Sequence, residues 1–311
     1  MAISNNNVIW MDGAMMPWRD ANVHVLTHTL HYGMGVFEGI RGYKTTKGAQ
    51  IFRLEDHIDR LINSAKIFEL TIPFTKEEIT QAIIDVVKSN NLADCYIRPL
   101  VFLGAEKFFR EESVSFSPKG NDVHIAIAAW DRGNYVADEK FTKGIRVKTS
   151  SYTRHHVNTS LVRAKAAGYY INSILANSEA VTDGYDEALM LDTEGFVSEG
   201  ACENVFMVRK GILYTPDLAS CLDGITRDSV IAIARDLGIE VREKRLTRDE
   251  FYTADEAFFT GTAAEIIPIA SLDNRAIGNG IGPVTKQIQE VFFKAVRNTS
   301  GRYKSWNTVI K

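Results

Sequence analysis

The stretch FRLEDHIDRLINSAKIFELTIPFTKEEITQAIIDVVKSNNLADCYIRPLVFLG, residues 52–104, decides the fold of the first part of the chain. Apolar residues recur every three or four positions over residues 52–70 and again over residues 75–91, with charged residues between them. This period predicts two amphipathic helices, each with one face in a core. Thr75 and Glu78 have the spacing of a capping box, so the second helix should begin directly after Thr75.

Strands should accompany these helices. Residues 94–104 and 122–130 are short runs of β-branched and apolar residues bounded by turn residues, which is typical of strands. Near the N-terminus, VIWMDGAMMPW (8–18) has the pattern of a hairpin around Asp12 and Gly13. The first part of the chain is therefore expected to be a sheet with helices packed on it.

A polar stretch without periodicity, DRGNYVADEKFTKG (131–144), is the predicted interdomain linker. We expect a small α/β domain over residues 1–130 and a large α/β domain over residues 145–311, with Lys165 at the opening of a helix in the large domain. Strands and helices alternate irregularly, so the predicted fold class is mixed α/β (α+β) rather than a doubly wound sheet. In the large domain we predict strands at 145–151, 187–192, 196–208, 211–215, 239–246 and 256–261, and helices at 226–238 and 284–297.

Composition excludes several function classes. The chain has 311 residues, is 45% hydrophobic, and carries 36 basic and 39 acidic side chains for a net charge of −3. Such a chain can bury a substantial core, and it lacks the basic excess that nucleic-acid binding requires. No apolar stretch approaches the length of a membrane span. Three widely spaced cysteines suit neither a disulfide framework nor a metal site, so we expect a cytoplasmic protein.

Common catalytic motifs are missing from the sequence. It has no Walker loop, HExxH pair or G-x-S-x-G elbow, and no G-x-G-x-x-G opens a helix. His24, His28 and His31 would share one face of a helix and could then bind a metal. The same segment could equally be a strand and a loop in which the histidines pack or form hydrogen bonds, and we expect no metal site.

Lys165 lies among small residues in VRAKAAGYY (162–170). Small neighbours leave room for a flat ring, and a desolvated amine has a lowered pKa and can form a Schiff base. A lysine in an alanine-rich helix can also simply face the solvent. The segment alone leaves both interpretations open.

A pyridoxal phosphate cofactor would also need a carboxylate near its ring nitrogen and donors for its phosphate. Glu199 interrupts an apolar strand, where an unpaired carboxylate would be costly to bury, so a cationic partner such as a pyridinium is implied. An exposed bulge position or an arginine partner would satisfy Glu199 equally. Gly224 before a helix and the turn at 260–263 could each bind phosphate, or could be ordinary caps.

Six segments in the same order carry a resemblance to a known family: HYGMGVFEGIRGY (31–43), YIRPL (96–100), VRAKAAGYY (162–170), SEGACENVF (198–206), LDGITRD (222–228) and GTAAEI (261–266). Together they closely resemble the branched-chain amino acid aminotransferases, which are class IV pyridoxal-phosphate enzymes. The resemblance implies a two-domain, fold type IV architecture like that of D-amino acid aminotransferase. It also implies pyridoxal 5′-phosphate as the cofactor.

The resemblance assigns roles residue by residue. Lys165 is implied to be the Schiff-base lysine and proton shuttle, Glu199 the partner of the pyridine nitrogen, and Tyr170 a contact of the ring's phenolic oxygen. Arg60 matches the family's phosphate-binding arginine. The remaining implied residues are Ile225, Thr226 and Thr262 for the phosphate and, for the substrate, Tyr32 from the neighbouring subunit, Phe37, Gly39, Tyr96, Arg98, Tyr135, Thr262 and Ala263.

The implied activity moves an amino group between L-Leu, L-Ile or L-Val and 2-oxoglutarate in two half-reactions with ping-pong kinetics. Phe37 and the tyrosines suit an aliphatic side chain, and Arg98 suits the second carboxylate of glutamate. Because Tyr32 would come from a neighbouring subunit, a homo-oligomer is implied, a dimer at least, with a hexamer left open.

Two segments depart from the family, and one is the loop LGAEKFFREESVS (103–115), which differs from the glycine-rich family form. Many members carry a Trp-Gly-x-Tyr segment where this chain has AWDRGNY (129–135), so Arg132 replaces the tryptophan while Tyr135 is kept. An arginine there could favour acidic substrates or could point to solvent. Other class IV enzymes remain alternatives, namely a D-amino acid or (R)-amine aminotransferase or aminodeoxychorismate lyase, and so does a non-catalytic cofactor carrier.

Overall fold

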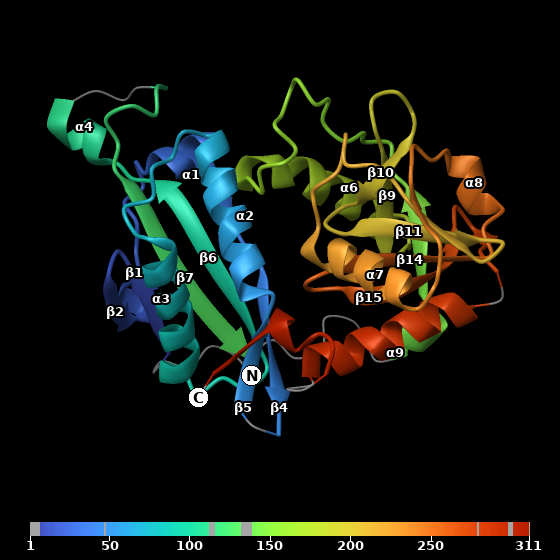
Figure 1. The fold of residues 1–311 in the computed structure, drawn as a ribbon. Helices are drawn as coiled ribbons and strands as arrows, with labels where there is room; N and C mark the ends of the chain where they lie inside the picture. The colour runs from blue at the N-terminus through green and yellow to red at the C-terminus, as the bar shows by residue number, and fades with distance from the viewer. Residues whose placement is uncertain are drawn as a thin grey trace. The chain divides into compact units, whose positions relative to one another are not determined.

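The computed structural model describes residues 7–46, 48–111, 116–131, 139–278, 280–297 and 301–310. The chain divides into two compact units (Figure 1). Unit 1 comprises Met1–Gly133, Ala164–Tyr169 and Val296–Lys311, and unit 2 comprises Asn134–Arg163 and Tyr170–Ala295. This division corrects the predicted one: the segment that holds Lys165 and the C-terminal residues pack with unit 1, whereas we expected both in the domain 145–311. Arg132 and Tyr135 lie outside the described residues.

Unit 1 is built on an antiparallel sheet in the order β17-β5-β4-β6-β7-β1-β2, with β3 paired to β6. Helices α2 and α3 lie on one face of this sheet, and α3 packs against β1, β6 and β7 (Figure 1). The elements of unit 1 are β1 (Val8–Met11), β2 (Ala14–Pro17), η1 (Trp18–Asp20), α1 (His28–Tyr32), β3 (Gly35–Phe37), β4 (Ile40–Thr45), β5 (Gly48–Phe52), α2 (Leu54–Ile67), α3 (Lys76–Ser89), β6 (Cys95–Leu103), α4 (Glu106–Glu111), β7 (Val123–Asp131), η2 (Ala167–Tyr169), η3 (Lys304–Trp306) and β17 (Asn307–Val309).

The predicted helices and the predicted hairpin of unit 1 are confirmed. At the start of α3 the capping box is complete: Thr75 Oγ1 accepts a hydrogen bond from the Glu78 N–H at 3.2 Å, and Glu78 Oε2 accepts one from the Thr75 N–H at 2.7 Å. Asp12 and Gly13 have positive φ angles of 48° and 94°, as a type I′ hairpin turn requires. Local sequence signals therefore set the ends of these elements.

The strand β6 carries residues of two kinds on its two faces. Cys95, Ile97 and Val101 are buried and belong to the apolar core of unit 1. Because successive side chains of a strand point to opposite faces, Tyr96 and Arg98 lie together on the other face. The two-residue period thus separates the core residues of β6 from its candidate substrate residues.

Unit 2 is built on a mixed sheet in the order β10-β9-β8-β15-β14-β11-β12-β13, with β16 paired to β15. The pairs β8–β9, β8–β15 and β12–β13 are parallel and the others are antiparallel. Its elements are α5 (Lys140–Lys143), β8 (Ile145–Thr149), α6 (Tyr170–Thr182), β9 (Glu187–Leu191), β10 (Val197–Gly200), β11 (Asn204–Arg209), β12 (Ile212–Thr215), α7 (Ile225–Asp236), β13 (Val241–Glu243), α8 (Arg248–Tyr252), β14 (Glu256–Gly261), β15 (Glu265–Leu272), β16 (Arg275–Ala276) and α9 (Pro283–Arg297), whose last two residues are grouped with unit 1.

The helix predicted around Lys165 begins later than expected. The α-helix α6 starts at Tyr170, and the 3-10 turn η2 precedes it. Lys165 lies before both, so it is not a helical residue, and the prediction that it opens a helix is wrong. None of the helices in the described ranges combines the length and the apolar character that crossing a bilayer requires.

Candidate active site

The backbone around Lys165 is held by three segments of unit 1. The Lys165 N–H donates to Ser64 Oγ on α2 at 3.1 Å, and the Lys165 carbonyl accepts from the Phe37 N–H of β3 at 3.0 Å. Three residues after Lys165, the Gly168 N–H donates to the Gly33 carbonyl at 3.0 Å. A Cβ on Gly168 would lie only 3.0 Å from that carbonyl oxygen, so glycine suits this close approach. These bonds to distant residues replace the helical bonds that the local sequence predicted.

The Lys165 amine lies beside an aromatic ring that a second cation also contacts. Lys165 Nζ is 5.3 Å from the centroid of the Phe37 ring, and Arg98 Cζ is 4.7 Å from the same centroid. Arg98 Nη2 donates to the Tyr96 hydroxyl at 3.3 Å. A Cβ on Gly39 would overlap that hydroxyl, so a larger residue here would force the Tyr96 side chain to shift. The structure therefore brings together the predicted residues Lys165, Phe37, Gly39, Tyr96 and Arg98.

Arg60 belongs to a buried charge network in the same unit. Its Nε and Nη2 donate to the two carboxylate oxygens of Glu38 at 2.6 and 2.9 Å, and His57 Nδ1 lies 2.7 Å from Glu38 Oε2. The Glu38 side chain is 0% exposed. Burial would raise the pKa of Glu38, but the charge of Arg60 and the hydrogen bonds hold it well below its usual value. Burial lowers the pKa of His57, and the neighbouring Glu38 opposes this shift.

Glu199 lies in unit 2 on β10, after a bulge in its pairing with β9. It is buried, and its Oε1 forms a salt bridge with Arg154 Nη2 at 2.5 Å. Asn204 Nδ2 donates to the other oxygen at 3.2 Å, and the Leu222 N–H lies 3.3 Å from both oxygens. The arginine alternative for the partner of Glu199 is therefore the one observed. A carboxylate has about four lone-pair positions, so the salt bridge to Arg154 does not prevent Glu199 from accepting a further hydrogen bond.

The two predicted anion segments of unit 2 are a helix start and a turn. Helix α7 begins at Ile225, after the N-cap residue Gly224, whose position provides no side-chain cap. A Cβ on Gly224 would overlap the Asn204 side chain, so the backbone approaches Asn204 closely. Thr226 in the first turn is buried. Thr262 and Ala263 form the turn between β14 and β15. Backbone N–H groups and hydroxyls at such a helix start suit a phosphate.

The predicted tyrosines and histidines occupy different settings. Tyr32 ends α1 with 42% of its surface exposed, and its ring lies 5.3 Å from that of Phe116. Tyr170 is the first residue of α6. The histidines contact backbone groups: His28 Nε2 lies 3.1 Å from the Phe116 carbonyl and His31 Nε2 2.9 Å from the Val25 carbonyl, while His24 Nδ1 accepts from the Leu26 N–H. These contacts match the hydrogen-bonding alternative.

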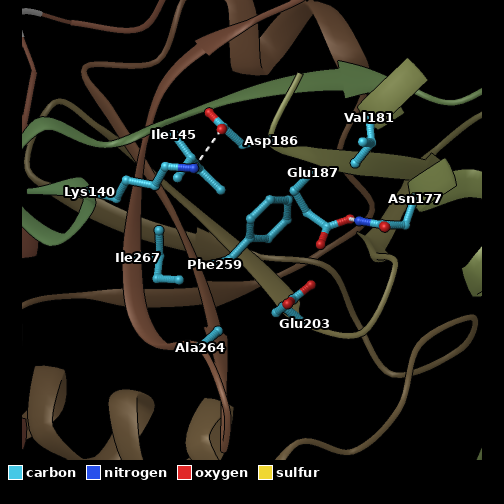
Figure 2. A pocket seen from close by; sticks show the side chains of 10 residues that line it. All are labelled: Lys140, Ile145, Asn177, Val181, Asp186, Glu187, Glu203, Phe259, Ala264 and Ile267. Atoms are coloured by element: carbon cyan, nitrogen blue, oxygen red, sulfur yellow. Dashed lines mark hydrogen bonds and ion pairs between the residues drawn. The ribbon is translucent and has the colours of Figure 1, made fainter. Parts of the chain in front are cut away.

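Unit 2 also contains a cavity of about 260 Å³ that no predicted site residue lines. Figure 2 shows the carboxylates of Glu187 and Glu203 lying next to each other at this cavity, and their oxygens are within 4.8 Å of the Cys202 sulfur. Burial and the neighbouring Glu187 raise the pKa of Glu203 to about 8. Burial also raises the pKa of Glu187. The cavity is lined by Lys140, Ile145, Asn177, Val181, Asp186, Glu187, Glu203, Phe259, Ala264 and Ile267.

Three residues of these networks were missed by the sequence analysis: Glu38, His57 and Arg154. A charged residue inside the apolar run GVFEGI was a usable signal for Glu38, since a buried acid needs a partner. His57 and Arg60 are three positions apart and so share a helix face, which pointed to a common partner. Arg154 lies in an aperiodic loop and offered no such signal.

Comparison with known proteins places these networks in a family context. Residues 35–272 match the family model described as amino-transferase class IV. The chain is 51% identical over 307 residues to the branched-chain-amino-acid aminotransferase of Pseudomonas aeruginosa, with 98% of each chain covered. It is 45% identical over 296 residues to the enzyme of the same name from Escherichia coli K12, with 94% of each chain covered.

Solved structures of branched-chain amino acid aminotransferases are also similar to this chain. The crystal structure of the T.th. branched-chain amino acid aminotransferase with pyridoxamine 5′-phosphate has a TM-score of 0.94 and 47% identity, covering 98% of this chain and 99% of that one. The same T.th. protein has been crystallised with N-(5′-phosphopyridoxyl)-L-glutamate and with 4-methylvaleric acid, each with a TM-score of 0.92, 46% identity and the same coverage.

Proposed function

Because the chain belongs to the class IV amino-transferases and, within them, to the branched-chain-amino-acid aminotransferases, we propose that it transfers the amino group of L-Leu, L-Ile or L-Val to 2-oxoglutarate. Pyridoxal 5′-phosphate is the cofactor, and the kinetics are ping-pong. The observation that carries the proposal is the position of Lys165, whose amine and the Arg98 guanidinium both lie over the Phe37 ring.

The donor set of this chain fits the cofactor. Lys165 offers an amine for a Schiff base, Glu199 offers a buried carboxylate for a ring nitrogen, and the Arg60 guanidinium suits a phosphate. The start of α7 has no side-chain cap, and only glycine fits at position 224 beside Asn204. When bound, the cofactor supplies an electron sink that stabilises negative charge at the substrate's α-carbon.

The chain's own residues then have distinct tasks. Lys165 Nζ moves the proton to and from the α-carbon, and its position depends on the two backbone hydrogen bonds to Phe37 and Ser64. Glu199, which Arg154 holds, accepts a hydrogen bond from the ring nitrogen. The family resemblance supports the remaining assignments, which are Tyr170 to the phenolic oxygen; Arg60, Ile225, Thr226 and Thr262 to the phosphate; and Tyr32, Phe37, Gly39, Tyr96, Arg98, Tyr135, Thr262 and Ala263 to the substrate.

Two kinds of substrate must use one subsite. Phe37 and Tyr96 offer apolar ring surface for a branched aliphatic side chain, and Arg98 offers a cation for the second carboxylate of glutamate. The ligands of the similar T.th. protein support this division, since one is a glutamate adduct and the other is a branched aliphatic acid.

We also propose a homo-oligomer, a dimer at least, that acts in the cytoplasm. Tyr32 is 42% exposed, which is compatible with a contribution to a neighbouring subunit's site. The near-neutral composition, with a net charge of −3, suits a small-molecule enzyme that binds neither nucleic acid nor membrane.

A panel of amino donors tests the proposal. With 2-oxoglutarate as acceptor, L-Leu, L-Ile and L-Val should give the highest kcat/KM, with D-Ala and (R)-amines far below them. Faster turnover of D-Ala or of aminodeoxychorismate than of L-Leu would assign the chain to another class IV activity. Absence of any half-reaction with excess L-Leu would make it a non-catalytic cofactor carrier.

A further inference from the structure

The carboxylate of Glu38 is surrounded by donors from three directions. Arg60 Nε and Nη2 donate to its two oxygens, His57 Nδ1 lies 2.7 Å from Oε2, and the Gly39 N–H donates to the same oxygen at 3.3 Å. The backbone of Glu38 is fixed as well, since its N–H donates to the Pro99 carbonyl of β6 at 3.0 Å. Glu38 is therefore a rigid, fully buried acceptor rather than a mobile surface charge.

This arrangement restricts Arg60 in a specific way. A bidentate pair holds the planar guanidinium in one orientation, because both hydrogen bonds lie in the plane of the group. Glu38 binds the edge that carries Nε and Nη2, so the guanidinium cannot rotate about its own axis without breaking both hydrogen bonds. His57 stiffens the pair from the same helix face, one turn before Arg60 on α2.

We propose that Glu38 is the positioning residue for Arg60: it fixes the plane of the guanidinium that would bind the cofactor phosphate, with His57 as its support. The inference rests on the proposed role of Arg60 as a phosphate ligand. Alternatively, the Glu38 carboxylate only neutralises the charge of Arg60. It would then weaken phosphate binding, and removing the carboxylate would strengthen phosphate binding.

The test measures what the phosphate contributes to cofactor binding. Dissociation constants of the full-length protein are determined from visible absorption for pyridoxal 5′-phosphate and for pyridoxal, which lacks the phosphate, and their ratio is compared among variants. Glu38→Gln and Arg60→Ala should each reduce the preference for the phosphorylated form by about tenfold or more. Glu55→Gln, an exposed position on the same helix, is the matched control and should leave the ratio unchanged.

The outcomes separate the inference from the proposed function. A smaller preference in Arg60→Ala combined with an unchanged or larger one in Glu38→Gln overturns the positioning role alone. An unchanged preference in Arg60→Ala overturns the phosphate role of Arg60 and the inference with it. Since Glu38→Gln could fail to fold, His57→Leu and His57→Asn provide a second comparison. The asparagine amide can replace the Nδ1 donor, so it should restore the preference that leucine lowers, and equal ratios in the two variants overturn the proposal.

Discussion

The Glu187–Glu203 pair predicts a stability that depends on pH. Burial and the nearby Glu187 raise the pKa of Glu203 from 4.5 to about 8. Below pH 4.5 the folded and the unfolded chain both carry the proton, and the full stability is present. As the pH rises toward 8, the unfolded chain has lost this proton while the folded chain keeps it, so the free energy of unfolding falls, and above 8 it falls no further.

The size of this effect follows from the same values. Moving a pKa from 4.5 to about 8 corresponds to about 5 kcal/mol, of which we expect about 3 kcal/mol after relaxation around the buried pair. Glu203→Gln imitates the protonated acid and removes the part of the pH dependence that Glu203 contributes, while Glu187, whose pKa is also raised, keeps its own part. It also weakens the hydrogen bonds that Glu203 accepts from the Cys202 N–H and thiol, which costs about 1 kcal/mol at every pH.

Differential scanning calorimetry of the wild type and of Glu203→Gln at pH 5, 7 and 9 measures the difference. At pH 9 the variant should melt above the wild type, by about 2–4 °C for each kcal/mol gained, and at pH 5 slightly below it. Glu290→Gln, at an exposed position on α9, is the control and should follow the wild type at each pH. A constant difference between Glu203→Gln and the wild type from pH 5 to 9 would refute the reasoning.

Three further predictions concern the active site and the fold. Lys165→Ala should abolish transamination and the visible absorption of the covalently bound cofactor, while Lys66→Ala, an exposed lysine on α2, should retain both; retained absorption in Lys165→Ala would place the Schiff-base lysine elsewhere. Gly39→Ala should raise KM for L-Leu about tenfold, because its methyl group displaces the Tyr96 hydroxyl, and an unchanged KM would contradict that contact. Thr75→Ala should lower the free energy of unfolding by about 1 kcal/mol in urea denaturation through loss of the capping box, and an unchanged midpoint would count against it.

The features that could be predicted from the sequence are those encoded by near neighbours. The helices α2 and α3 follow from a three-to-four-residue apolar period, the start of α3 from Thr75 and Glu78, and the first hairpin from Asp12 and Gly13. Each of these signals lies within a few residues of the structure that it specifies. The same local rule predicted a helix through Lys165, and there it was wrong.

The Lys165 segment shows why local rules fail at this site. Its alanines favour a helix by intrinsic propensity, but its backbone groups bond to β3, to Gly33 and to Ser64, between 101 and 135 positions away in the chain. Propensity differences among ordinary residues are below about 1 kcal/mol each, so a few tertiary hydrogen bonds and two facing glycines outweigh them. Because these contacts form only when distant segments meet, no window around residue 165 contains them.

The partners of the buried acids also could not be predicted from neighbouring residues in the sequence. The sequence indicated that Glu199 needs a partner, because it interrupts an apolar strand, but it did not identify Arg154, which is 45 positions earlier in a loop without periodicity. Glu38 likewise meets Arg60 only when α2 packs beside β3. An isolated buried carboxylate is costly, so each must fold together with its cation. Each of the two carboxylates is therefore fixed in orientation by the packing within its own unit, and neither orientation could be predicted from the residues around it in the sequence.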